Sequence, residues 1–411
     1  MIRSTVARVD LSSLQSNFHA IQRFLASGGT APGIIAVVKA NAYGHGAGRV
    51  ALALEQAGAT MLACADIEEG IVLRRGGVTV PILIFGALTV SDLDGLFEYS
   101  LVPTISTPFA ARAVQQAARR RGSTIGYHLK IDTGMNRLGF RFDNLQRTLR
   151  ELLASANLRL DAVYTHFATA DDPESPLFSD QRLRFEQALA VIDELRSAKA
   201  LRHPGETVAH GGPPAADRQA STALSGRRAT RLSAAGILCH AANSAALLRD
   251  ARVWYDIVRP GLLLYGIVPP PLASTIELAP VLSLTSRVVA VKGVRPGEGV
   301  SYGCRYVADR PSSVAVVPAG YADGLDTRLS GRGFVLIRGR RVPIVGAVCM
   351  DMMMADVTGL DVAPGDEVVI IGRQGDESWQ QIDVREMAAA IGTIPWEIVC
   401  RIGARIERIY E

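Results

Sequence analysis

The first candidate for chemistry is a lysine that follows an apolar run. Residues 34–38 are apolar, and Lys39 comes directly after them. Burial disfavours a charged ammonium and lowers its pKa, so a lysine at the end of a buried strand offers a nucleophilic amine that can form a Schiff base. Tyr43 and the glycine-rich residues 44–46 (GHG) add a hydroxyl group and flexible backbone, which suit a neighbouring phosphate. A lysine at a strand end is more often structural than catalytic, so one lysine alone does not define a site.

Three more apolar runs also end in polar residues. These endings are residues 130–132 (KID), 164–166 (YTH) and 240–244 (HAANS). The carboxyl ends of barrel strands meet at one face of the barrel, so we expect these groups to lie together with Lys39. Polar residues that only mark strand ends would explain one such group, but they explain four together poorly.

The polar groups lie in a repeating pattern between residues 33 and 266. Short runs that are apolar on both faces alternate with segments of helical spacing, such as 48–57, 108–121 and 181–197, which is typical of a parallel sheet. Eight units predict an α/β fold, a TIM-like (β/α)8 barrel. A doubly wound open sheet has the same local pattern and is the competing fold. The eight runs are 34–38, 61–65, 81–85, 101–105, 125–131, 158–165, 235–240 and 257–265.

The pattern changes after three prolines at 269–271. Alternating apolar segments with glycine-containing turns follow, and one helix is expected over 383–390. We therefore expect a barrel over 10–268 and a mainly β C-terminal domain over 272–411, which residues 1–9 could join. Residues 201–232 are rich in Gly, Pro, Ala, Arg and Ser without apolar periodicity, which predicts an inserted surface loop.

Composition narrows the class of protein. The formal net charge is +4 with basic and acidic residues interspersed, and the short basic run 119–121 is predicted to be a solvated helix end, not a nucleic-acid site. The five cysteines are scattered without CxxC spacing, which disfavours disulfides or zinc and favours a reducing cytosol. Neither a signal-peptide core nor a run of about 18 apolar residues occurs, so we expect a cytoplasmic protein without a membrane span.

Residues 38–46 (VKANAYGHG) resemble the cofactor-lysine signature of alanine racemases. This resemblance implies a fold-type III pyridoxal-phosphate enzyme that acts as a head-to-tail homodimer on alanine and supplies D-alanine for peptidoglycan. Many ordered motifs over two domains are more specific than a single one. The further matching segments are 130–139 (KIDTGMNRLG), 165–168 (THFA), 240–244 (HAANS), 259–262 (RPGL), 265–266 (YG), 301–303 (SYG), 320–324 (GYADG) and 348–351 (VCMD).

The resemblance implies how the cofactor is held. Lys39 matches the lysine that forms the Schiff base with pyridoxal phosphate. Tyr43, Ser244 and the backbone N–H groups of Gly261 and Leu262 match the groups that hold the phosphate. Glycine suits this place because its backbone approaches an anion closely.

Further matched residues surround the cofactor ring. Arg259 matches the residue that faces the pyridine nitrogen; an arginine does not give up its proton, so the ring would stay unprotonated and transamination would be disfavoured. His166 matches a residue packed near the ring. Arg137 matches the contact to the cofactor phenolate and the substrate carboxylate, and its fork suits oxygen pairs. Lys130 matches a lysine that is often carbamylated in the family and braces that arginine.

Racemisation removes a proton from one face of Cα and delivers one to the other, so it needs two bases. Lys39 covers one face, and Tyr302 resembles the partner-subunit tyrosine that covers the other. His240 is the candidate to interact with Tyr302 and tune it. Met350 and Asp351 resemble partner-subunit residues near the substrate carboxylate.

Two positions concern the entrance. Tyr321 resembles the gate tyrosine of the entry corridor. Trp396 stands where the family usually has a tyrosine whose hydroxyl contacts the phosphate, and it offers only an indole N–H on a larger ring. The change affects both the phosphate contact and the preference for a small substrate, so a serine-accepting racemase is a competing function.

Two more competing functions belong to different classes of protein. A fold-type III amino acid decarboxylase generally has an acidic partner at the pyridine nitrogen, which Arg259 and Tyr302 disfavour. A non-catalytic pyridoxal-phosphate-binding protein resembles the barrel alone, and the second domain with Tyr302 and Met350 argues against it.

Overall fold

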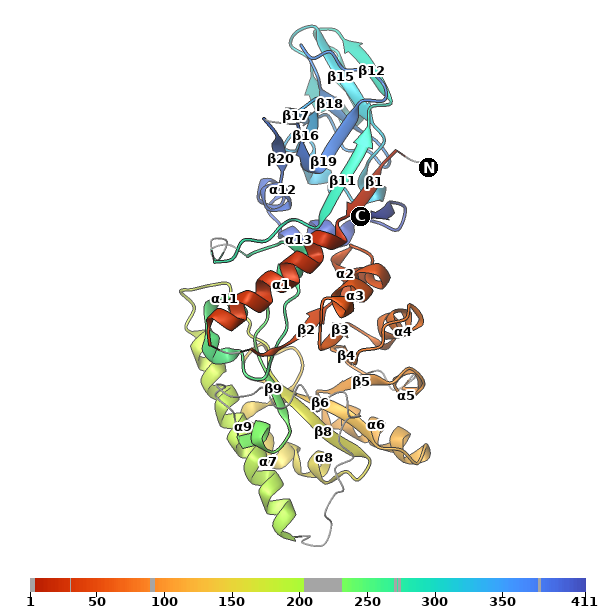
Figure 1. Cartoon of the computed structure of the whole chain (residues 1–411). Coiled ribbons are helices and arrows are strands. Elements are labelled where there is room, and N and C mark those ends of the chain that lie inside the picture. Colours follow the sequence, from red (N-terminus) through yellow and green to blue (C-terminus); the bar gives the residue numbers. More distant parts are fainter. Residues whose placement is uncertain are drawn as a thin grey trace.

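The computed structural model describes residues 4–29, 31–88, 93–202, 231–269, 272, 275–375 and 378–411. The chain forms two parts, a barrel built from the N-terminal two thirds and a mainly β part from the remainder (Figure 1). The predicted insertion at 201–232 and the prolines at 270 and 271 lie almost entirely outside the described residues.

Eight parallel strands of the described residues close into a barrel. Neighbouring strands pair in the order β5, β4, β3, β2, β10, β9, β8 and β6, and the additional pairing of β5 with β6 closes the sheet into a ring. The predicted TIM-like barrel is therefore confirmed, and the open doubly wound sheet is wrong because those pairings close the sheet. A short strand β7 (Phe140–Arg141) adds to β6. The barrel strands are β2 (Gly33–Val37), β3 (Met61–Cys64), β4 (Ile82–Ile84), β5 (Leu101–Ile105), β6 (Ile125–Asp132), β8 (Leu158–Tyr164), β9 (Leu238–His240) and β10 (Ile257–Val258).

Helices cover the barrel, and α6 (Pro108–Arg120) illustrates why they form. Thr107 caps its N-terminus by accepting from the N–H of Ala110, and Pro108 occupies the first turn, where no N–H is needed. The predicted solvated run at 119–121 is exposed at its end. The other helices of this part are α1 (Leu11–Ser27), α2 (Lys39–Tyr43), α3 (Ala47–Gln56), α4 (Ile67–Arg75), α5 (Asp94–Glu98), α7 (Leu145–Thr148), α8 (Arg150–Ala154), α9 (Leu177–Arg202), α10 (Arg231–Ala234) and α11 (Ser244–Arg249), with 3-10 turns η1 (Phe142–Asn144), η3 (Ala251–Val253) and η4 (Leu262–Tyr265).

The second part is dominated by a largely antiparallel sheet, as expected for a mainly β domain. The N-terminal strand β1 (Val6–Val9) belongs to this sheet, between β11 and β21. The strands that follow the barrel are β11 (Leu282–Arg287), β12 (Ala290–Val294), β13 (Gly299–Val300), β14 (Tyr306–Val307), β15 (Ser312–Val317), β16 (Phe334–Ile337), β17 (Arg340–Val345), β18 (Met353–Asp356), β19 (Glu367–Gln374), β20 (Gln380–Ile382) and β21 (Glu407–Tyr410). The helices are α12 (Val384–Ile391) and α13 (Pro395–Arg401), with turns η6 (Tyr302–Cys304), η7 (Tyr321–Asp323) and η8 (Thr327–Leu329).

The two parts meet where α13 packs against α2, directly after barrel strand β2 (Figure 1). Helix α13 carries Trp396 and α2 begins at Lys39, so residues more than 350 positions apart come to one place. Over the described residues, every helix is too short or too polar to cross a membrane.

Candidate active site

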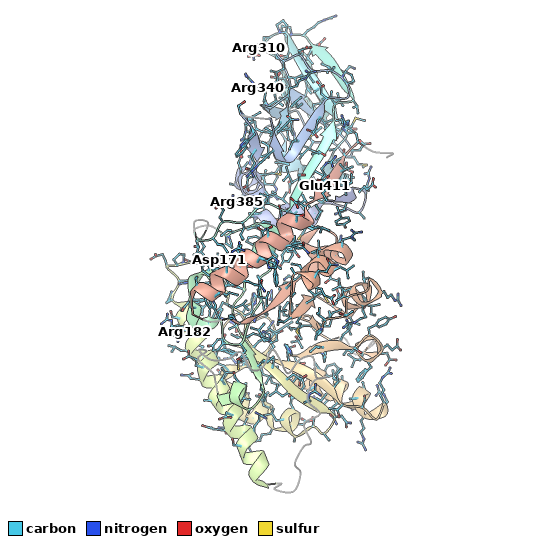
Figure 2. The ribbon with its side chains drawn as sticks, viewed as in Figure 1. Asp171, Arg182, Arg310, Arg340, Arg385 and Glu411 are labelled. Atoms are coloured by element: carbon cyan, nitrogen blue, oxygen red, sulfur yellow. The ribbon has the colours of Figure 1, made fainter. Side chains whose placement is uncertain are left out.

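A cavity of about 430 Å³ opens at the carboxyl ends of the barrel strands. This volume lies in the range of ordinary small-ligand sites. Asp171, which also lines it, lies at the end of the barrel nearest the second part (Figure 2). The cavity brings together most of the residues singled out from the sequence, namely Lys39, Tyr43, Lys130, Arg137, His166, Ser244, Arg259, Gly261, Leu262 and Trp396.

The segment after Lys39 has an unusual backbone. Ala40, Asn41, Ala42 and Tyr43 all have φ between 51° and 55°, so they form a turn of left-handed helix. This conformation costs L-residues roughly 1–2 kcal/mol each, which is why left-handed turns are rare. The turn returns the chain to the cavity within four residues, so that Lys39 and Tyr43 both line it.

Side chains outside the turn satisfy its backbone. One carboxylate oxygen of Glu69 accepts from the N–H of Ala40 at 2.7 Å. The guanidinium of Arg408, on strand β21, donates to the carbonyl of Gly44 at 3.1 and 3.2 Å. Gly44 has φ 84°, and a Cβ there would overlap the carbonyl oxygen of Val399 in α13. The turn is therefore held by both parts of the chain.

The cavity gathers positive charge. Burial and the nearby Arg137 lower the pKa of Lys39, which increases the fraction of its nucleophilic neutral amine. Burial, followed by Arg137 and Arg259, lowers the pKa of Lys130 to about 8. Among the described residues that line the cavity, Asp171 is the one carboxylate. This charge suits a ligand that carries phosphate and carboxylate groups.

Hydrogen-bond donors cluster at one place in the wall. The N–H of Gly261 points to Ser244 Oγ at 2.9 Å, and a Cβ at Gly261 would lie 2.6 Å from the Tyr43 hydroxyl. Burial raises the pKa of Tyr43, so its hydroxyl keeps the proton it donates. Two hydroxyl groups and a close-approaching backbone fit a phosphate, and glycine leaves the necessary space.

Arg259 is buried at the edge of the cavity, and within the described part of the chain it forms no ion pair with a carboxylate. Its Nη2 donates to the carbonyls of Thr165 and Ala241 at 2.8 and 2.9 Å. Its Nη1 donates to His240 Nδ1 at 2.8 Å, and His166 Nδ1 lies 3.5 Å from Nη2. Burial lowers the pKa of Arg259 to about 10, so it is still a cation at neutral pH.

The predicted contact between His240 and Tyr302 is wrong. His240 is fully buried in the barrel, and its ring nitrogens are bonded to Arg259 and to His128. No surface of it is accessible to a tyrosine from this chain or from another copy. His166 is the histidine that lines the cavity, so it and not His240 is available to such a group.

Four of the singled-out residues lie away from this cavity. Tyr302 and Met350 are 78% and 57% exposed on the second part, and Tyr321 and Asp351 are exposed as well. Within one chain, none of the four is among the described residues that line the cavity.

Tyr164 belongs to the strand-end group 164–166, but no role was assigned to it from the sequence. Its ring lines the cavity, stacks on His240 with centroids 4.7 Å apart, and lies beside Arg259 and Lys130 at 5.2 and 5.7 Å. Its hydroxyl bonds Thr104 Oγ1 at 3.0 Å. The alternation along β8 was a usable signal, because a residue two positions before His166 is expected on the same inward face.

A cavity at the mouth of a barrel, lined by a lysine amine and by a cluster of hydrogen-bond donors, is typical of the barrel enzymes. Comparison with known proteins specifies the family. Residues 9–211 and 212–269 match the family model described as the alanine racemase N-terminal domain, and 281–410 match the C-terminal domain.

Individual relatives also indicate the alanine racemase family. An alanine racemase of Symbiobacterium thermophilum is 40% identical over all of this chain and 97% of its own length. A Bacillus anthracis alanine racemase structure with bound L-Ala-P is 35% identical, with a TM-score of 0.84 over 100% of this chain and 96% of that one. A Bartonella henselae alanine racemase with covalently bound pyridoxal phosphate is 25% identical, with a TM-score of 0.78 over 99% of both chains.

The chain belongs to the alanine racemase family, and it is an isomerase that acts on amino acids.

A first prediction concerns His45, which braces the left-handed turn. Its Nδ1 lies 3.0 Å from the carbonyl of Ala42 and 2.9 Å from that of Tyr43. Burial lowers the pKa of His45 to about 4. Between pH 6.5 and 4 the unfolded chain therefore binds a proton that the folded chain does not, and stability falls as the pH falls.

His45→Asn keeps an N–H donor near the Nδ1 position and removes the titration. We expect the free energy of unfolding to drop between pH 6 and pH 5 by about 1 kcal/mol more in the wild type than in this variant. Urea denaturation at the two pH values measures the difference. His19→Asn, at an exposed histidine of α1, is the matched control. Equal pH dependence in His45→Asn and wild type would contradict the argument.

Proposed function

We propose that this chain interconverts L-alanine and D-alanine with pyridoxal phosphate attached to Lys39. The observation that carries the proposal is Lys39, with its lowered pKa, in one cavity with the Tyr43, Ser244 and Gly261 cluster. When bound, the cofactor supplies a carbonyl that captures the substrate amine and a ring that delocalises the electrons released at Cα.

Arg259 holds the ring nitrogen of the cofactor in this proposal. An arginine donates a hydrogen bond and keeps its proton, so the ring nitrogen stays unprotonated and withdraws electrons weakly. Weak withdrawal disfavours side reactions such as amino-group transfer, and it argues against a decarboxylase. Two carbonyl acceptors and His240 fix the direction of the guanidinium.

Lys130 and Arg137 act on the carboxylate of the substrate and on the cofactor phenolate. Both line the cavity, and the pKa of about 8 gives Lys130 a substantial neutral fraction near neutral pH. A neutral amine reacts with carbon dioxide, and the resulting carbamate would place a negative charge beside Arg137. We propose this modification as the brace for Arg137.

The two bases are Lys39 and the partner subunit's Tyr302, in a head-to-tail homodimer. Tyr302 and Met350 are exposed apolar side chains, and their chain neighbours Ser301 and Cys349 are in contact at 3.2 Å, which supports this arrangement because exposed apolar surface is typical of an interface. Ser301, Gly303 and Cys304 all have positive φ, and strained turns of this kind cluster at functional sites. Met350 and Asp351 accompany Tyr302 across the interface, and Tyr321 acts at the entrance.

We further propose that the enzyme supplies D-alanine for peptidoglycan in the cytoplasm. Small neutral amino acids, with alanine first, are the substrates that this proposal favours. Trp396 at the cavity wall supports one extension of this range, the acceptance of serine, because a changed wall alters the space beside the substrate.

Lys39→Ala tests the cofactor attachment. We expect racemisation of alanine to fall by at least roughly a thousandfold, since the base and the Schiff base are lost together. Lysine occurs only at positions 39, 130, 199 and 292, so borohydride reduction followed by peptide mapping identifies the attachment site directly. Exposed Lys292→Ala is the control. Reduction that marks another lysine would refute the assignment.

A mixing experiment tests the shared sites. Neither Lys39→Ala nor Tyr302→Phe is active alone in this proposal, but a heterodimer of the two has one site with both bases intact. Random exchange makes half of the dimers hybrid, so we expect about a quarter of wild-type activity. If the tyrosine served its own chain, every site would lack one base, and heterodimers verified by mass spectrometry would stay inactive.

Trp396→Tyr tests the entrance. Restoring a hydroxyl is expected to tighten cofactor binding by up to roughly a hundredfold, because a hydrogen bond to a charged group is worth about 1–3 kcal/mol. The alanine-to-serine ratio of kcat/KM should rise as well. Chiral assays and cofactor titrations of the two proteins provide the measurement. No change in either quantity would make position 396 a packing site only.

A further inference from the structure

Three side chains form a continuous hydrogen-bonded chain that leads from the cavity into the barrel. Arg259 Nη1 lies 2.8 Å from His240 Nδ1, and His240 Nε2 lies 2.9 Å from His128 Nδ1. Arg259 directly follows β10, His240 ends β9 and His128 lies in β6, and all are buried, with exposures of 3% or less. His128 is not among the described residues that line the cavity, and it plays no part in the proposed reaction steps.

The direction of these hydrogen bonds follows from the arginine. Every N–H of a guanidinium is a donor, so His240 Nδ1 must accept and carries no proton. A neutral imidazole then carries its proton on Nε2, which donates to His128 Nδ1. The nitrogen of His128 at this contact is therefore an acceptor.

Both imidazoles stay neutral in this arrangement. Burial, followed by the charge of Arg259, lowers the pKa of His128 to about 3 and that of His240 well below its ordinary value. Tyr164 stacks on the His240 ring at 4.7 Å and keeps its own proton, since burial raises its pKa to about 12. A second proton on either histidine would set two N–H groups against each other.

We propose that His128 is a positioning residue, which keeps the proton of His240 on Nε2 so that Nδ1 always accepts from Arg259. The inference rests on the proposed function of Arg259 opposite the cofactor ring nitrogen. Without an acceptor at position 128, a proton on Nε2 of His240 would be buried without a partner, so the proton moves to Nδ1. Two donors then face each other, and the guanidinium is displaced from the place where it meets the ring.

The expected consequence is a change in the fraction of turnover that ends in a side reaction instead of racemisation. A displaced guanidinium leaves the ring nitrogen open to protonation from water, and a protonated ring withdraws electrons more strongly. Part of the turnover would then end in a side reaction. The Cα proton and two electrons of alanine would go to the cofactor, water would supply the carbonyl oxygen of the released pyruvate, and the cofactor would keep the amino group as pyridoxamine phosphate. Each such event consumes one bound cofactor.

Two variants of matched design separate hydrogen bonding from packing. In His128→Asn the side-chain oxygen lies near the place of Nδ1 and accepts from His240. In His128→Leu the volume is kept approximately and the acceptor is lost. We expect pyruvate release per racemisation event to rise at least tenfold in His128→Leu and to stay within about twofold of the wild type in His128→Asn.

The tautomer is measured independently of activity. The chain has seven histidines, so ¹⁵N-histidine spectra of the holoenzyme are assignable by single substitutions. We expect a protonated Nε2 and an unprotonated Nδ1 for His240 in the wild type and in His128→Asn. This result is separate from the proposed function, which fails instead if the wild type neither retains pyridoxal phosphate nor racemises alanine.

Two results would overturn the inference. The first is a proton on Nδ1 of His240 in the wild-type spectrum. The second is an equal pyruvate partition in His128→Leu and wild type. If His128→Leu does not fold, the wild-type spectrum and the His128→Asn variant still test the inference. Loss of the Nε2-protonated tautomer of His240 in His128→Asn would contradict the proposed acceptor role.

Discussion

The left-handed turn after Lys39 is the constraint on which the rest of the site depends. Four successive L-residues with positive φ cost roughly 4–8 kcal/mol together, which is comparable to the whole net stability of an ordinary domain. The turn persists because Glu69 and Arg408 satisfy its backbone and α13 packs on Gly44. The left-handed turn, and with it the position of Lys39, therefore depends on the packing of the second part against the barrel.

The same packing explains why the two parts form one site. Helix α13 restrains the turn through the backbone of Val399 and also places Trp396 in the cavity wall. A change in this helix therefore acts on both the lysine turn and the shape of the pocket. This coupling links the shape of the cavity wall to the position of the Lys39 amine.

Positive charge is the second organising feature. Lys39, Lys130, Arg137 and Arg259 line one cavity, and gathering four cationic groups there is unfavourable because Lys130 and Arg259 are buried. Burial lowers the pKa values of Lys39, Lys130 and Arg259, and for the two lysines the nearby Arg137 lowers the pKa further. An anionic ligand offsets the repulsion among these groups, so the cavity favours a cofactor and a substrate that carry phosphate and carboxylate groups.

The sequence alone determined the barrel and most of the residues of its cavity. Runs of apolar residues and helical spacing are local patterns, and a strand that ends in Lys39 or Arg259 places that residue at the barrel mouth by topology alone. Only the tertiary structure decided the left-handed turn, the stacking of Tyr164 on His240 and the burial of His240 between Arg259 and His128. These depend on contacts between residues distant along the chain, and such contacts leave no periodic trace in a single sequence because each is a unique pairing of two surfaces.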